Sequence, residues 1–332
     1  MNDQAASLRE LVQEKNEYGG PLPPAAPVPS AVPSAPYPAS SSLAPAMPEA
    51  GVQTPVLSRV FRPTMKSGAR VIAITSGKGG VGKTNLTVNL ALAMTKIGRR
   101  VLIVDADLGM ANVDVVLGTV SKHHLLHLLQ PDVTLEDVLI HGPYGINYIS
   151  GGSAIERATD FSPQERQCLM DKLNACETMA DIVLVDTGAG IGRNVLDFIL
   201  AADEVILVTT PEPTALTDAY AVMKAYSINS EKKDLKIVVN RVYDEGESSE
   251  VLMKLQRTSE KFLSMSLTSL GFIYEDRSVM NAVKQQQPLL SAYPDTVAAR
   301  CIEAVAKNVL YGGEHKIRFG WKGFLQRLLN FS

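Results

Sequence analysis

The chain has 332 residues, of which 45% are hydrophobic and 20% charged, with a formal net charge of −3. This length suits one large domain or two small ones, and the near-neutral charge argues against the global basic surface of many nucleic-acid-binding proteins. Three cysteines without a CxxC pair argue against a disulfide framework. The polar N-terminus predicts no secretory leader, and no run approaches the roughly 20 apolar residues that span a bilayer. We therefore expect a soluble cytosolic protein.

Residues 1–18 are compatible with a short amphipathic helix. Asn2 or Asp3 is a suitable N-cap. The apolar residues that follow share one helical face: Ala5, Leu8, Leu11 and Val12. A lone helix this short is marginal in water, so a frayed terminus is the alternative interpretation.

Residues 19–66 predict a stiffened, disordered tether. The stretch 19–48 has no charged residue and holds ten of the 19 prolines of the chain. Proline fixes the backbone and removes hydrogen-bond donors, and the stretch has no aliphatic run to bury.

Residues 67–312 read as one α/β domain. Apolar, β-branched runs at 71–75, 101–105, 181–186, 204–209 and 236–240 predict strands. Candidate helices lie between or after them, near 84–97, 163–179, 192–201, 214–229 and 246–264. Strands that are apolar on both faces and alternate with helices predict a mostly parallel sheet covered on both sides.

The first predicted strand is followed by a phosphate-binding loop. Residues 76–84, SGKGGVGKT, satisfy G-x-x-x-x-G-K-[ST] between a strand and a helix. Glycine N–H groups and the helix N-terminus favour a polyphosphate; Lys83 is expected to neutralise the β- and γ-phosphates, and the Thr84 hydroxyl to bind Mg²⁺. The predicted nucleotide-binding residues of the loop are Gly77, Gly79, Gly80, Val81, Gly82, Lys83, Thr84 and Asn85. Lys78 is a second lysine inside the loop, where an ammonium has no evident packing purpose.

Two further strand ends bring carboxylates to the same edge. Asp105 ends the strand at 101–105 and Asp107 follows it, while Asp186 ends the strand at 181–186. Carboxyl ends of parallel strands face the ligand crevice of an open α/β sheet. Asp186 is therefore expected to hold Mg²⁺ through water, and its glycine-rich sequel 188–192 to move when the γ-phosphate leaves.

The last segment, 313–332, is cationic and amphipathic. Wound as a helix, it places five side chains on one apolar face: Ile317, Trp321, Phe324, Leu325 and Leu328. Basic residues flank this face, a pattern that suits an anionic membrane surface. A final helix packed on the core of its own domain is the alternative.

The histidines at 123, 124 and 127 do not predict a zinc site. No H-E-x-x-H pattern accompanies them, and a surface turn entering a helix is the simpler interpretation.

Residues 70–311 resemble the MinD/ParA ATPases, whose deviant Walker A loop matches Lys78-Gly-Gly-Val-Gly-Lys83-Thr84. The segments DADLGMANVDVVLG and VDTGAGIG look most like those of the flagellar-number regulators (FlhG, FleN or YlxH). Residues 3–9, DQAASLR, resemble the N-terminal D-Q-A-x-x-L-R helix of that branch. The resemblance implies a P-loop NTPase fold of the SIMIBI type that hydrolyses ATP with Mg²⁺.

The resemblance also implies roles for individual residues. Lys78 would reach the phosphates of the partner subunit in an ATP-dependent homodimer, Asp107 would orient the attacking water, and Asp105 would help to position Mg²⁺ or its waters. The residues that resemble the base pocket of the family are Asn240, Arg241, Pro211, Tyr274 and Asp276, the last two in a loop at 271–276. Relatives usually carry proline where this chain has Tyr274. Asn240 as a strand-end turn residue is the alternative.

The branch further implies partners. Its N-terminal helix binds the GTPase FlhF and stimulates GTP hydrolysis, with Gln4 as the associated residue; the expected contact residues are Asp3, Gln4, Ala5, Leu8 and Arg9. Flagellar C-ring (switch) proteins, a flagellar master transcription regulator and the anionic inner membrane are further expected partners. Direct nucleic-acid binding is not expected. A MinD-type division-site ATPase and a ParA-like DNA-segregation ATPase are the alternatives; the second needs a basic patch, whereas residues 67–313 sum to −6.

Overall fold

The computed structural model describes residues 68–330, apart from 108–111, 152–161, 233 and 313–319. The predicted helix at 1–18 with its FlhF-binding residues, the predicted tether at 19–66, and Ile317 lie outside the described residues.

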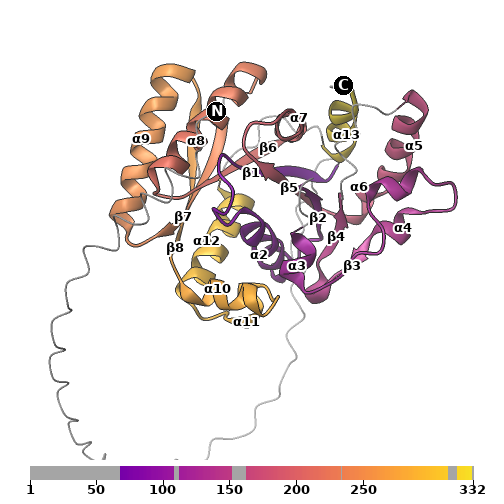
Figure 1. The fold of residues 1–332 in the computed structure, drawn as a ribbon, viewed down its shortest axis with the longest axis horizontal. Coiled ribbons are helices and arrows are strands. Elements are labelled where there is room, and N and C mark those ends of the chain that lie inside the picture. The colour runs from indigo at the N-terminus through magenta and orange to yellow at the C-terminus, as the bar shows by residue number, and fades with distance from the viewer. Residues whose placement is uncertain (1–67, 108–111, 152–161, 233, 313–319, 331–332) are drawn as a thin grey trace, which may run out of the picture. The chain divides into compact units, whose positions relative to one another are not determined.

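The described residues form one eight-stranded sheet in the order β3-β4-β2-β5-β1-β6-β7-β8 (Figure 1). The strands are β1 (Arg70–Ser76), β2 (Val101–Ala106), β3 (Ile140–His141), β4 (Asn147–Ser150), β5 (Ile182–Ala189), β6 (Glu204–Thr209), β7 (Asp234–Val242) and β8 (Ser266–Tyr274). Neighbouring strands pair in parallel except β3 with β4, which are antiparallel. The carboxyl ends of β1, β2 and β5 therefore meet at one edge of the sheet.

Helices cover both faces of the sheet. Successive residues of the central strands point to opposite sides, and both sets are apolar, so each face needs a covering layer. In β1, Val71 and Ala73 belong to one apolar cluster, and Ile72 and Ile74 to the other. The first face packs against α4 (Leu135–Val138), α5 (Pro163–Leu173), α6 (Cys176–Met179), α7 (Arg193–Ala201), α8 (Pro213–Asn229), α9 (Glu245–Leu263) and α13 (Gly320–Asn330). The second packs against α2 (Lys83–Lys96), α3 (Val113–Leu117), α10 (Arg277–Lys284), α11 (Leu289–Ala292) and α12 (Val297–Tyr311). This layering confirms the predicted α/β class.

Three local expectations differ from the structure. The predicted helix at 163–179 is two helices, α5 and α6, with Asn174 and Ala175 between them. The predicted loop at 271–276 is mostly strand, because β8 continues to Tyr274 beside β7. The strand β4 and the helix α12 were not predicted from the sequence. With four residues, β4 is too short to give a distinct periodic signal. The helix α12 does carry a helical period, with Ala298, Ile302, Val305 and Val309 buried, and was missed.

The three histidines form a turn around the 3-10 helix η1 (Leu125–Leu129). The backbone N–H of His124 donates to Nδ1 of His127 at 2.8 Å, which closes the start of the turn. Among the described residues, no three His, Cys, Asp or Glu side chains are grouped in a way that could hold a metal ion.

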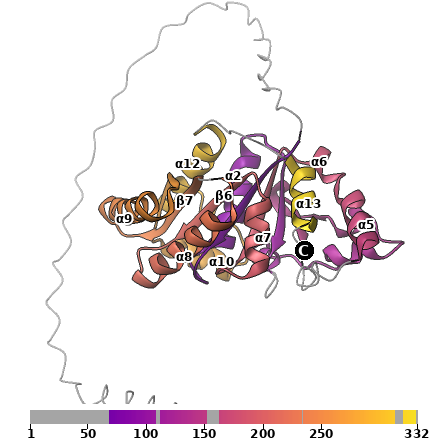
Figure 2. The ribbon, with the colours of Figure 1, turned by 90° about the horizontal axis from the view of Figure 1, so that it is seen from above.

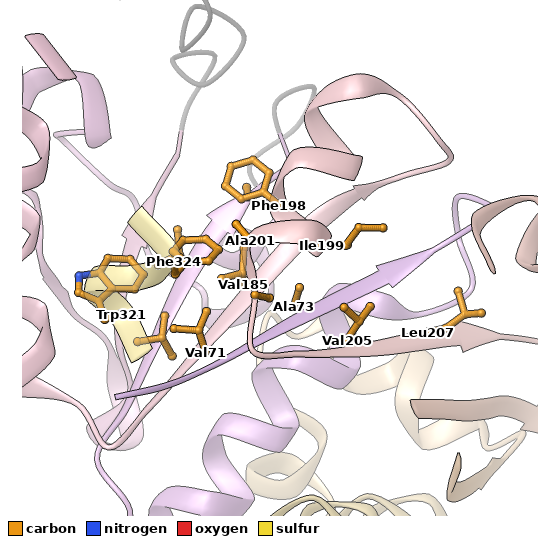
Figure 3. Packing of buried hydrophobic residues seen from close by; sticks show 14 of the residues in the cluster. Val71, Ala73, Val185, Phe198, Ile199, Ala201, Val205, Leu207, Trp321 and Phe324 are labelled. Carbon is orange, nitrogen blue, oxygen red and sulfur yellow. The ribbon is translucent and has the colours of Figure 1, made fainter. Parts of the chain in front are cut away.

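The C-terminal helix α13 packs into the core of the domain (Figures 2 and 3). Trp321, Phe324 and Leu325 are each no more than 2% exposed. The ring of Phe324 stacks between Trp321, at a centroid distance of 5.3 Å, and Phe198 of α7, at 6.4 Å. Nε1 of Trp321 donates a hydrogen bond of 2.6 Å to the carbonyl oxygen of Leu173. Four of the five side chains predicted to face a membrane thus contact the domain itself, Leu328 being partly buried.

The start of α13 lies against the start of β1. Gly320 has a φ of 66°, and a Cβ added there would meet the Cα of Gly68 at 3.4 Å. At the other end of the helix, the Arg327 guanidinium lies 3.9 Å from the carboxylate of Asp203. No helix among the described residues is long and apolar enough to cross a bilayer.

Candidate functional site: a phosphate loop facing two strand-end carboxylates

The loop between β1 and α2 is shaped by close backbone approaches. A Cβ added to Gly77 would lie 2.2 Å from the backbone of Asp218 in α8, so only glycine fits there. Gly82 is the N-cap of α2 with a φ of 94°, a conformation that glycine adopts without strain. No atom lies within 4 Å of where a Cβ would stand on Gly79 or Gly80. The middle of the loop is therefore open, as a phosphate-binding loop requires.

Lys83 and Asp186 meet beneath this loop. Nζ of Lys83 lies 3.1 Å from Oδ1 of Asp186, and both side chains are buried. Burial raises the pKa of the Asp186 carboxyl, although Lys83, Thr84 and Thr87 each stabilise its charged form. The other oxygen, Oδ2, is buried and has no hydrogen-bond partner. An unpartnered buried oxygen at this point is suited to a ligand or to a water bound to one.

Asp105 and Asp107 flank this pair from the end of β2. The two oxygens of Asp105 accept hydrogen bonds of 3.1 Å from the backbone N–H groups of Asp107 and Val113. Burial, and next the charge of Asp186, raise the pKa of Asp105 to about 7. The carboxylate of Asp107 lies beside Gly188, where an added Cβ would be 3.7 Å from its Oδ1. The structure thus brings together all three carboxylates predicted from the strand ends.

Lys78 contacts α8 within its own subunit. Its ammonium donates to Oε2 of Glu212 at 2.7 Å and to the hydroxyl of Thr214 at 2.8 Å. The Lys78 side chain is 38% exposed and that of Glu212 52%. Lys78 therefore lies at the open edge of the site, paired with an acidic residue that was not predicted from the sequence.

One of the predicted base-pocket residues, Asn240, contacts the phosphate loop. Nδ2 of Asn240 donates a hydrogen bond of 2.7 Å to the carbonyl of Val81, and its Oδ1 accepts one from the N–H of Arg241. The Arg241 backbone has a φ of 61°, and its guanidinium pairs with Glu275 at 2.7 Å. In this structure Asn240 fastens the end of β7 to the phosphate loop.

The remaining predicted base contacts come from three other places in the fold. Pro211 connects β6 to α8 and is half-exposed. Tyr274 ends β8, with its ring edge against Phe272 at a centroid distance of 5.2 Å. The carboxylate of Asp276 accepts a hydrogen bond of 2.8 Å from the N–H of Ser278, which makes it the N-cap of α10.

The donor set at the strand ends suits Mg²⁺. The Thr84 hydroxyl and the carboxylates of Asp105 and Asp186 are hard oxygen ligands of the kind that Mg²⁺ prefers, directly or through water. The orphaned Oδ2 of Asp186 is the observation that supports this fit. Lys83 supplies the counter-charge that a polyphosphate needs in the same place.

Three residues at the site were not predicted from the sequence: Thr87, Glu212 and Thr214. Thr87 carried a weak signal, because it lies four residues after Lys83 and so shares its face of α2. Glu212 and Thr214 carried none, since only the fold brings α8 to the loop.

The match to a family model supports this description of the site. The family is ParA, described as NUBPL iron-transfer P-loop NTPase, and its model matches residues 68–310. The chain therefore belongs to the ParA/MinD family of P-loop NTPases. Membership supports ATPase activity and the role of an ATP-dependent regulator.

Two relatives support the predicted branch of the family, and one of them is a flagellar protein by name. The antiactivator FleN of Pseudomonas aeruginosa is 40% identical over 240 residues, which cover 72% of this chain and 86% of that protein. The flagellum site-determining protein YlxH of Helicobacter pylori is 35% identical over 272 residues, 80% of this chain and 92% of that protein. The predicted relationship to the flagellar-number regulators is confirmed.

A solved structure agrees with the fold. MinD of Pyrococcus horikoshii in complex with Mg-ADP is 28% identical, with a TM-score of 0.58, and the match covers 75% of this chain and all of that one. This likeness confirms the predicted MinD-like P-loop fold.

Proposed function

We propose that this protein hydrolyses ATP in the presence of Mg²⁺ and uses the cycle as a switch. The observation that carries the proposal is the buried contact between Lys83 and Asp186, with a free carboxylate oxygen beneath an open phosphate loop. Lys83 binds the β- and γ-phosphates, and Asp107, beside Gly188, orients the attacking water. Bound Mg²⁺ neutralises charge on the phosphate oxygens during transfer.

The switch is an ATP-dependent homodimer. Lys78 is part-exposed at the edge of the site, so it can leave Glu212 and reach the phosphates bound by a second copy. A dimer that depends on shared ATP separates after hydrolysis. Lys78→Gln is therefore expected to abolish ATP-dependent dimerisation while leaving ATP binding to the monomer.

Hydrolysis and dimerisation are tested together on the full chain. ATP turnover is measured with Mg²⁺ and with EDTA, and mass in solution is measured with ATP and with ADP. We expect Mg²⁺-dependent turnover, loss of turnover in Asp107→Ala, and a dimer with ATP alone. Equal turnover in Asp107→Ala and the parent chain would contradict the hydrolysis mechanism.

The regulated process is flagellar number or placement. The similarity to FleN and YlxH supports this proposal, as does the D-Q-A-x-x-L-R-like segment at 3–9, which lies outside the described residues. We propose that this segment stimulates GTP hydrolysis by FlhF, and that C-ring proteins and a flagellar transcription regulator are further partners.

The test uses peptide 1–18 and the full chain, each mixed with purified FlhF while GTP hydrolysis is followed. Stimulation that is lost in Gln4→Ala supports the proposal. No stimulation by either preparation would contradict the proposal and favour the alternative of a MinD-type division-site ATPase.

Membrane association is the second output of the switch. The apolar side chains of α13 pack on the domain, so binding to the anionic inner membrane requires α13 to leave its site. We propose that the dimer binds reversibly from the cytoplasm, because two weakly bound tails act together. Co-sedimentation with vesicles of anionic and of zwitterionic lipid, with ATP or ADP, tests this; binding that is independent of nucleotide and lipid charge would contradict it.

A further inference from the structure

Thr87 is a buried hydroxyl one helical turn into α2. Its side chain is fully buried, and Oγ1 lies 3.1 Å from Oδ1 of Asp186 and 3.0 Å from the carbonyl oxygen of Lys83. The phosphate-loop motif ends at Thr84, so no part of the motif assigns a role to this residue.

The hydroxyl has one proton and two acceptors. A threonine in a helix ordinarily donates to the carbonyl four residues earlier, as Thr95 does to Ala91 at 2.9 Å in the same helix. A carboxylate is the stronger acceptor, because a hydrogen bond to a charged group is stronger than one between neutral groups. Thr87 is therefore placed to donate to Asp186 whenever that carboxylate is ionised.

The Oδ1 atom of Asp186 is also contacted by a second donor, the ammonium of Lys83. The distance between Lys83 Nζ and Oδ1 is 3.1 Å. In the proposed function, however, the same ammonium binds the phosphates of ATP. When Lys83 is drawn to the phosphates, its bond to Asp186 weakens. The Thr87 hydroxyl is neutral and fixed within α2, so the phosphates do not attract it away from Asp186.

We propose that Thr87 is a positioning residue for Asp186: its hydroxyl holds Oδ1 when ATP recruits Lys83, which keeps the unpartnered Oδ2 directed toward the metal and phosphate side of the site. The inference rests on the proposed Mg²⁺-dependent ATPase. Thr87 touches neither phosphate nor metal, and acts only through the carboxylate.

The experiment compares Thr87→Val, Thr87→Ser and the parent chain. Thr87→Val keeps the shape of the side chain without its hydroxyl, and Thr87→Ser keeps the hydroxyl. Binding of a fluorescent ADP analogue is measured with Mg²⁺ and with EDTA, and ATP turnover is titrated with Mg²⁺. Thr95→Val is the matched control, since it removes the same kind of hydroxyl from α2 away from the site.

For Thr87→Val we expect about a tenfold rise in the Mg²⁺ concentration that gives half-maximal turnover, the effect of one lost hydrogen bond to a charged group. Nucleotide affinity in EDTA should not change. Thr87→Ser should restore the parent value, and Thr95→Val should match the parent throughout.

A double-mutant cycle separates positioning from a general loss of stability. In an Asp186→Asn background, Thr87→Val should no longer change the Mg²⁺-dependent part of nucleotide binding. An equal effect in both backgrounds, or an unchanged Mg²⁺ requirement in a folded Thr87→Val, would overturn the inference. If the parent chain itself needs no Mg²⁺, the proposed function fails instead.

Discussion

Phe324 at the centre of the docked helix α13 offers a direct test of how firmly the tail is held. Its ring is 1% exposed and stacks on both Trp321 and Phe198. Truncating a buried phenylalanine to alanine costs about 3–5 kcal/mol. Because about 1.4 kcal/mol corresponds to a factor of ten in an equilibrium constant, Phe324→Ala should lower the ratio of docked to undocked tail by at least about a hundredfold.

Trp321 is the chain's only tryptophan, so its fluorescence reports the position of α13 without a label. In Phe324→Ala we expect red-shifted emission and stronger quenching by acrylamide, or, if the tail stays docked, a lower unfolding temperature. Phe262→Ala is the control, because that ring is 64% exposed on α9. Unchanged emission, quenching and unfolding temperature in Phe324→Ala would refute the packing argument.

Three further predictions concern the nucleotide site. Glu212→Gln removes the negative charge that pairs with Lys78, so ATP-dependent dimerisation should need less protein, by at most several-fold because the pair is exposed and screened by salt; analytical ultracentrifugation at two salt concentrations checks this. In the nucleotide-free protein, the raised pKa of Asp105, about 7, disfavours its ionisation in the folded chain. The free energy of unfolding should therefore fall as the pH rises from about 4 to about 7 and then level off, whereas Asp105→Asn should flatten this part of a denaturation series. Gly77→Ala places a Cβ 2.2 Å from the backbone of α8, so the loop must shift; a nucleotide titration should show loss of binding, with a cost in stability of about 1–3 kcal/mol.

Features that depend on local sequence could be predicted well. The phosphate loop is a continuous motif, and Asp105 and Asp186 follow apolar strands whose ends must meet in a parallel sheet. The convergence of Lys83, Asp186 and Asp105 therefore followed from pattern and topology alone.

Features that depend on tertiary contact could not be predicted. Glu212 lies 134 positions from Lys78, and no sequence pattern near either residue indicates that the two form an ion pair. The location of the apolar face of α13 could not be predicted for a different reason. A basic helix with an aromatic face can bury the same apolar area against a membrane surface or against a protein core. Its composition therefore does not distinguish the two locations.

Gly68 and Gly320 keep the start of α13 close to the start of β1 because neither has a side chain. A Cβ built on either glycine would lie 3.4 Å from the Cα of the other. A larger residue at either position would therefore press the first turn of α13 away from the sheet, at the end of the helix that holds Trp321 and not at the turn that holds Arg327.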